Sequence, residues 1–452
     1  MSGKALLILV IGFTLIFIVA GYFWGSLATR SVDNHVSYYK NTIAHNIAVS
    51  GANIALAEIS QDSTWMESST FTRDFENGEM NVEIPALGPM VRTIKSTGTF
   101  MGVDQIVKVK WMRDQGSLAK YAWFIPSVST GSPQQRPWIT GDSIWGGFHS
   151  NQFTVVDGNP VFFGKVTDLK GIKDMGSGSN PQFLGGYQTG VEVAWVSSMH
   201  YPNYAALAGP SATYSKDLWL KFNSDGTVTY RVGASNNAGQ DSTKYGTPNT
   251  VAISAFAPNG VVYVDKANVY MSGVLNGKVT IVAEGASGSG GPGNVYLTGD
   301  MIYNIDPMIP NGAGGYMVNP ASLDADGKPL DVMGIIATND IVVSTSNKGT
   351  LGGYENNVVN QDIQIDAGIF CNSGGFKAES LGSSTEGTDV PMGSIYLQGS
   401  MTAGKEEIVA QFDGSTLTAG YNRHVIFDER FATGPPTFFP YITYYRVISW
   451  LE

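Results

Sequence analysis

The chain has 452 residues and a formal net charge of −11, because 38 Asp and Glu outnumber 27 Lys and Arg. This acidic balance, with no basic stripe to override it, argues against nucleic-acid binding. The single cysteine, Cys371, excludes an internal disulfide, and the five histidines show no metal-ligand spacing.

The first predicted element is a membrane-spanning helix. Residues 5–29 carry no charge, and residues 5–24 supply about 20 mostly apolar positions, enough to cross a hydrocarbon core about 30 Å thick. A signal peptide cleaved near Ala28 is the alternative, although the apolar region of signal peptides is shorter, about 7–15 residues. The residues expected to contact membrane lipid are Leu6, Leu7, Ile8, Leu9, Val10, Ile11, Phe13, Leu15, Ile16, Phe17, Ile18 and Val19.

The helical pattern continues beyond the apolar segment. Val32, Val36 and Tyr39 begin a series of apolar residues spaced by three, four or a multiple, and no proline occurs before Pro85. We therefore expect residues 1–64 to form one transmembrane and amphipathic helix that ends near residue 61. A stripe of small residues on it predicts contact with another helix or, as the alternative, with the protein's own sheet. This small-residue stripe consists of Ala44, Ala48, Gly51, Ala52 and Ala55.

Two β regions follow the helix. In residues 65–116, alternating runs predict a small antiparallel sheet packed on the helix; one such run places Val107, Val109 and Trp111 on a single face. Residues 117–259 are interpreted as an irregular β region with long loops, in which Asp225-Gly226 marks a hairpin turn.

Residues 260–420 contain a repeated strand unit. Its near copies are Asn-Val-Tyr-Met-Ser-Gly at 268–273, Asn-Val-Tyr-Leu-Thr-Gly at 294–299 and Ser-Ile-Tyr-Leu-Gln-Gly at 394–399. Strand–turn units that recur without intervening helices predict a right-handed parallel β-helix or solenoid, with a two-sheet sandwich as the alternative. The aromatic tail, residues 421–452, carries two proline-bearing turns, and we expect it to cap the open end of the solenoid.

Three segments carry a resemblance to known proteins. The pattern Phe427-Asp428-x-Arg430 followed by Pro435-Pro436 resembles the end of a bacterial family without an assigned activity, and residues 141–162 resemble the N-terminal part of the same proteins. The first 60 residues are similar to those of PilX-type minor pilins. The expected fold is therefore mainly β with one long N-terminal α-helix, in which a small pilin-like helix-plus-sheet module precedes the β-helix.

The N-terminus departs from that of a major pilin, which has a basic leader, a glycine cleavage site and a glutamate at the fifth mature position. Cleavage between Gly3 and Lys4 would place Ile8 fifth, and cleavage after Gly12 would place Phe17 there. Prepilin processing therefore does not follow from the sequence.

Candidate catalytic and ligand-binding groups are few. His149, beside Asp142 and Asn151 in a glycine-rich segment, is interpreted as a turn histidine rather than a metal or sugar contact. Asp324 and Asp326 match only part of a calcium loop and are interpreted as a polar turn.

Acidic residues in the solenoid region are the remaining candidates. Glu406 and Glu407 could serve a glycosidase or lyase, but no convergent catalytic set accompanies them, and Cys371 lies in an apolar strand. We expect no catalytic residue, metal site or cofactor.

These patterns predict a non-enzymatic, membrane-anchored envelope protein, related to type IV pili or acting in surface adhesion. The expected partners are membrane lipid and like helices or a pilus machine, with polysaccharide or surface contact open. The expected location is the bacterial inner membrane, with one span and a periplasmic C-terminal domain, or else the cell surface or a pilus. The alternative is a membrane-tethered β-helix enzyme that acts on polysaccharide.

Overall fold

The computed structural model describes residues 3–61, 69–75, 77–84, 91–126, 136–176, 178–191, 193, 199–286, 291–345, 361–384, 388–413 and 416–451. The residues group into two units, Met1–Gln115 with Thr443–Glu452, and Gly116–Ile442. Each unit has its own buried core.

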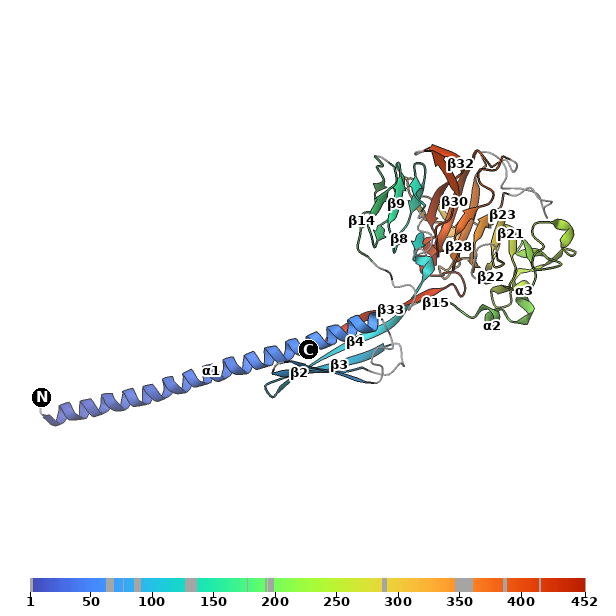
Figure 1. Ribbon diagram of the computed structural model, residues 1–452. Helices are drawn as coiled ribbons and strands as arrows, with labels where there is room; N and C mark the ends of the chain where they lie inside the picture. Colours follow the sequence, from blue (N-terminus) through green and yellow to red (C-terminus); the bar gives the residue numbers. More distant parts are fainter. Residues whose placement is uncertain are drawn as a thin grey trace. The chain divides into compact units, whose positions relative to one another are not determined.

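The first unit is built on one helix. α1 runs without interruption from Gly3 to Gln61, 59 residues, which confirms the predicted continuity of the helix and its end. Four antiparallel strands follow, and Figure 1 shows them along the C-terminal half of α1. They are β1 (Thr70–Phe75), β2 (Gly78–Glu83), β3 (Val91–Phe100) and β4 (Val103–Ser117).

The sheet packs on α1 as its alternating sequence requires. Val107, Val109 and Trp111 are buried on one face, while Ile106 on the other face is 43 % exposed. β33 (Tyr441–Leu451), the last strand of the chain, adds to the same sheet beside β4. The tail expected to cap the solenoid therefore ends in this sheet, because its last strand pairs with the edge that β4 would otherwise leave free.

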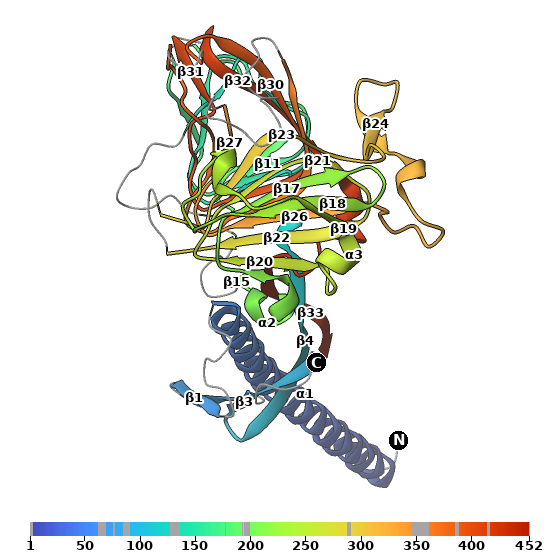
Figure 2. The ribbon, with the colours of Figure 1, turned by 90° about the vertical axis from the view of Figure 1, so that its right-hand side faces the viewer.

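The second unit is dominated by parallel strand pairing. The strands of the first ladder are, in spatial order, β16 (Thr213–Tyr214), β20 (Val261–Asp265), β22 (Lys278–Glu284), β26 (Val332–Ala337), β28 (Ile363–Cys371), β30 (Pro391–Ala403), β5 (Trp123–Ile125), β8 (Phe148–Ser150), β11 (Val166–Asp168) and β14 (Tyr187–Gln188). Figure 2 shows β20, β22 and β26 as neighbours in this ladder.

Two further ladders run beside the first. The second ladder comprises β17 (Leu218–Asn223), β21 (Val269–Leu275), β23 (Val295–Tyr303), β27 (Ile341–Val343) and β29 (Phe376–Ala378). The third ladder comprises the later half of β23, the first halves of β28 and β30, β32 (Thr416–Phe427), β7 (Ser143–Trp145), β10 (Val161–Phe162) and β13 (Gln182–Phe183). A separate parallel sheet comprises β6 (Trp138–Ile139), β9 (Thr154–Asp157) and β12 (Ile172–Asp174).

Shorter strands and helices lie outside the three ladders. β18 (Thr227–Val232) and β19 (Asn249–Ala252) form antiparallel pairs beside β17, and β31 (Ala410–Asp413) forms one with β32. β24 (Met308–Pro310) pairs with β25 (Tyr316–Val318), and β15 (Met199–His200) with β33. The short helices are α2 (Tyr204–Ala208) and α3 (Ile253–Phe256).

The order of strands in space differs from the order in the sequence. Strands from residues 123–188 stack beyond β30 and β32, which come from residues 391–427. The sequence placed residues 117–259 and 260–420 in separate regions, whereas the structure joins them in one unit. The reason is that the exposed edges of the last strands, β30 and β32, are covered by strands made much earlier in the chain.

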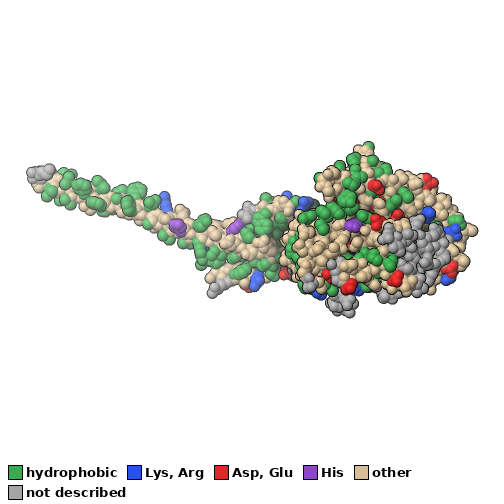
Figure 3. Space-filling model, turned by 90° about the horizontal axis from the view of Figure 1, so that it is seen from above, with side chains coloured by type: hydrophobic (Ala, Val, Ile, Leu, Met, Phe, Trp, Pro, Cys, Tyr) green, Lys and Arg blue, Asp and Glu red, His purple; other side chains and the backbone are tan. Residues whose placement is uncertain are grey.

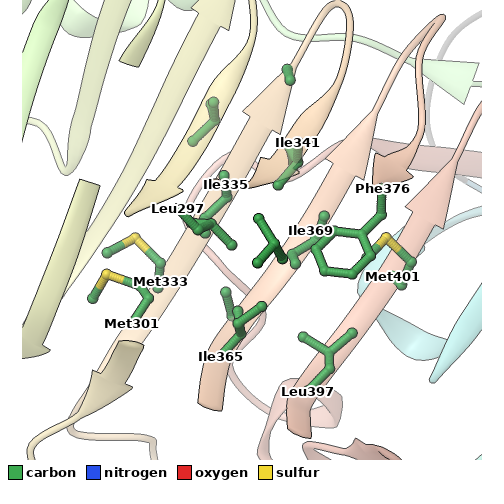
Figure 4. Packing of buried hydrophobic residues seen from close by; sticks show 14 of the residues in the cluster. Leu297, Met301, Met333, Ile335, Ile341, Ile365, Ile369, Phe376, Leu397 and Met401 are labelled. Atoms are coloured by element: carbon green, nitrogen blue, oxygen red, sulfur yellow. The ribbon is translucent and has the colours of Figure 1, made fainter. Parts of the chain in front are cut away.

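The interior between the ladders is apolar. Inward-facing residues from successive strands form columns, such as Ile335, Ile369 and Met401 in Figure 4. A second cluster lies outside the first ladder, where Phe124, Ile336 and Phe370 pack against α2 and the segment that contains Phe439. The first ladder is therefore buried on both faces, as parallel strands usually are.

Asparagine and aspartate side chains connect successive strands of the second ladder. Oδ1 of Asp217 accepts the N–H of Asn268, Oδ1 of Asn268 accepts that of Asn294, and Oδ1 of Asn294 accepts that of Asp340. Oδ1 of Asp340 then accepts the N–H of Gly375. Each of these residues directly precedes a strand, so the repeated Asn-Val-Tyr motif satisfies the backbone groups where the chain turns.

Candidate functional site

The most exposed apolar surface of the described chain is the N-terminal half of α1. The twelve predicted lipid-contacting residues are all exposed, from 51 % at Ile11 and Val19 to 72 % at Phe17. By length and composition, α1 could cross a membrane. Figure 3 shows apolar side chains covering this end of the helix before the first basic and histidine side chains appear. Exposure of this surface to water is unfavourable, because burying one large apolar side chain lowers the free energy by about 1.5–3 kcal/mol.

The small-residue stripe lies further along the same helix and is fully covered. Ala44, Ala48, Ala52 and Ala55 have no exposed surface. A Cβ added at Gly98 of β3 would lie 2.1 Å from the carbonyl oxygen of Ala44. The stripe therefore lets the helix approach its own sheet at backbone contact.

Gly51, the fifth residue of the stripe, shows the same arrangement. A Cβ there would lie 2.5 Å from Oγ of Ser96 and 2.9 Å from a methyl of Val82. In this chain the stripe thus packs against the protein's own sheet, which is the alternative left open by the sequence. The physical reason is that small residues permit close approach to any backbone, strand or helix.

His149 is buried on β8 rather than placed in an open turn. Its Nδ1 lies 2.7 Å from Oγ1 of Thr167 and its Nε2 lies 2.8 Å from Oδ1 of Asn151. Burial lowers the pKa of His149, so the neutral ring is favoured. Thr167 of the neighbouring strand β11 and Asn151, just after β8, thus engage both ring nitrogens, which is a structural arrangement.

Asp142, which the sequence placed near His149, belongs to a buried ion pair. Its carboxylate accepts two bonds from the guanidinium of Arg423, at 3.1 and 2.5 Å, and one from the backbone N–H of Ile139. The guanidinium also lies 3.9 Å from the centre of the Trp138 ring. This pair ties β32 to the segment before β7.

The partial calcium pattern is a closed turn. Oδ1 of Asp324 accepts the backbone N–H groups of Asp326 and Lys328, and Oδ1 of Asp331 accepts that of Gly277. Among the described residues, no group of three or more His, Cys, Asp or Glu side chains could hold a metal ion.

The remaining acidic and thiol candidates also have structural contacts. Glu407 pairs with Nζ of Lys405 at 2.7 Å, and Oε2 of Glu406 accepts the N–H of Arg136. Burial raises the pKa of Glu406 to about 7. Cys371 is fully buried in the interior of the ladders, and burial raises the pKa of its thiol.

A buried ionic cluster at Asp428 and Arg430 was not assigned a role from the sequence. The guanidinium of Arg430 donates to both carboxylate oxygens of Asp428, at 2.9 and 2.8 Å, and to the carbonyl of Ser322. It lies 5.1 Å from the ring centre of Tyr303, whose backbone N–H donates to Asp366. The motif Asp428-x-Arg430 was the feature of the sequence from which this ion pair could have been predicted.

Asp366 should make stability depend on pH. Burial raises its pKa to about 7, although the N–H of Tyr303 and the amide of Gln364 favour the charged form. An unfolded aspartate titrates near about 3.9, so between about pH 4 and 7 the folded protein binds more protons and its free energy of unfolding falls as pH rises.

The test compares urea unfolding of Asp366→Asn with that of the parent protein. We expect the stability of the variant, relative to the parent, to rise from about pH 4 to 7 and then level off. The exposed Asp389→Asn is the matched control for the loss of a surface carboxylate. A constant difference for Asp366→Asn would contradict the prediction.

Comparisons with known proteins show similarity to solved structures only. No protein-family profile and no curated protein matches the chain. The crystal structure of the competence-associated pilin ComZ from Thermus thermophilus is similar over 91 % of this chain and 97 % of that chain, with a TM-score of 0.33 and 12 % sequence identity. This TM-score does not establish a shared fold.

Proposed function

We propose that this protein is a non-enzymatic, membrane-anchored component of the bacterial envelope that acts in a pilus-related assembly, as minor pilins do. The observation that supports the proposal is the division of α1 into two halves. The first half is apolar and exposed, whereas the small-residue face of the second half is covered by the protein's own sheet. The first half therefore requires a covering of lipid or of like helices.

The second unit is the part that the anchor would display, in the periplasm or on the cell surface or a pilus. We infer that its three parallel ladders form a β-helix-like solenoid, in which each coil contributes one strand to each ladder. Two features support this inference: the asparagine and aspartate side chains that hydrogen-bond from one strand to the next, and the continuous apolar interior. The right-handed sense of the coil stays a prediction.

The enzymatic alternative has less support. The acidic side chains that were candidates for catalysis are held by an ion pair or a backbone donor, as Glu407 is by Lys405 and Glu406 by the N–H of Arg136. These contacts explain the residues without a substrate.

Cysteine scanning tests the assembly. Each variant of the full chain carries one cysteine at a position from Leu6 through Val19, and it is oxidised in its native membrane. The native Cys371 is buried and should not form crosslinks. If like helices assemble, disulfide-linked products should recur every three or four positions, because one face of the helix makes the contact. Uniformly weak crosslinking along the whole segment would contradict assembly through the helix.

N-terminal sequencing with membrane fractionation tests processing. A mature chain that begins at Lys4 would indicate prepilin cleavage, and one that begins at Met1 or Ser2 would indicate a plain anchor. A start at Thr29 with an empty membrane fraction would contradict the proposed topology, because cleavage there removes the apolar half of α1.

A further inference from the structure

A polar cleft of about 410 Å³ lies along the outer face of the second ladder. Its volume falls within the range of small-molecule sites, about 300–1,000 Å³. Asn236, Asn237, Asp340 and Lys377 contribute to its lining. Further lining residues are Asn268, Tyr270, Gly291, Pro292, Asn294 and Tyr296.

Two stacked tyrosines occupy this face of the ladder. Tyr270 and Tyr296 pair across β21 and β23, and their rings lie 4.7 Å apart at 11°. Their neighbours in sequence, Met271 and Leu297, point into the core, so the tyrosines point outward. Tyr270 and Tyr296 lie at equivalent positions on successive strands because each is the third residue of an Asn-Val-Tyr unit.

The tyrosine hydroxyls are not engaged by the described residues, although Tyr270 is only 4 % exposed. Within the described ranges, neither hydroxyl has a hydrogen-bond partner, and neither is among the fully buried unsatisfied atoms. Burial raises the pKa of Tyr296 to about 12, so its hydroxyl stays protonated and can donate as well as accept.

Neutral amides complete the polar lining. Asn268 uses its oxygen to bind Asn294, which leaves its Nδ2 group without a partner in the described structure. Asn237 is exposed at the rim. The charges of Asp340 and Lys377 neutralise each other in an ion pair, so the cleft offers several neutral hydrogen-bonding groups and no net charge.

We propose that this cleft binds a neutral, hydroxyl-rich ligand, namely an uncharged oligosaccharide. Sugar hydroxyls both donate and accept, and they match the tyrosine hydroxyls and asparagine amides better than they match a charged or apolar lining. An anionic ligand would find no unpaired cation here, because Lys377 is engaged by Asp340. The inference is independent of the proposed assembly through α1.

The test uses the full chain in lipid nanodiscs without glycolipid, because glycoside detergents would compete for the cleft. The protein is screened against an array of neutral and acidic glycans, and the dissociation constant of the strongest neutral hit is measured by calorimetry. Tyr270→Phe and Tyr296→Phe each remove one hydroxyl while keeping the ring stack. Each should weaken binding by about 3- to 10-fold, the effect of one neutral hydrogen bond.

Tyr396→Phe is the matched control. Tyr396 comes from the related Ser-Ile-Tyr unit and stacks on His424, with 4.8 Å between ring centres, in the third ladder. The Tyr396→Phe substitution should leave the dissociation constant of the glycan unchanged. The proposal is overturned if no neutral glycan binds, if only acidic glycans bind, or if the control weakens binding as much as the cleft variants.

Discussion

Replacing Leu15 and Ile16 with lysine is expected to release the protein from the membrane. Both residues lie near the middle of the apolar segment, and they are 57 % and 63 % exposed. A lysine at the centre of a span costs about 2.5–3.5 kcal/mol, whereas each large apolar residue contributes only about 0.3–0.6 kcal/mol to insertion. Two lysines therefore offset the insertion free energy of the ten predicted lipid-contacting residues that remain.

The measurement is the fraction of protein that stays in the membrane pellet after carbonate extraction. Val32→Lys with Val36→Lys is the matched control, because these residues are also exposed on α1 but lie beyond the apolar segment. The control should stay in the pellet. If the Leu15 and Ile16 variant also stays there, the apolar half of α1 is not the anchor.

Replacing Asp428 with alanine is expected to cost about 3–5 kcal/mol of unfolding free energy, because it leaves the charge of Arg430 buried without its partner. The side chains of both residues have no exposed surface. A domain is usually stable by only about 5–15 kcal/mol, so the loss should shift the urea midpoint strongly.

Two further variants separate the ion pair from general damage. Asp428→Ala combined with Arg430→Met should be less destabilised than Asp428→Ala alone, because no unpaired charge remains in the interior. Lys244→Gln breaks an exposed pair with Asp241 and should cause no measurable loss. If the double variant is less stable than Asp428→Ala, the buried charge is not the source of the effect.

The long helix could be predicted from the sequence because its determinants are local. An uncharged apolar segment, a helical spacing of apolar residues and the absence of proline extend over neighbouring residues, and α1 follows them from Gly3 to Gln61. The antiparallel sheet of residues 70–117 could be predicted for the same reason, since each strand pairs with the next along the chain.

The stacking order could not be predicted, because it depends on contacts between distant residues. Ser143 pairs with His424, 281 residues away, and their side chains are 2.7 Å apart. Nothing in either local sequence specifies this partner. The same holds for Asp142 and Arg423, which are also 281 residues apart and form one buried ion pair.

The sequence by itself determined which segments are helix and strand, where the apolar anchor lies, and which strand unit repeats. Only the tertiary structure decided what covers each surface. It placed the small-residue stripe against the protein's own strands, the tail strand beside β4, and the two tyrosines side by side above a polar cleft. The physical reason is that spacing along the chain fixes the direction of a side chain, whereas its partner depends on which distant strands minimise exposed apolar surface and unpaired edges.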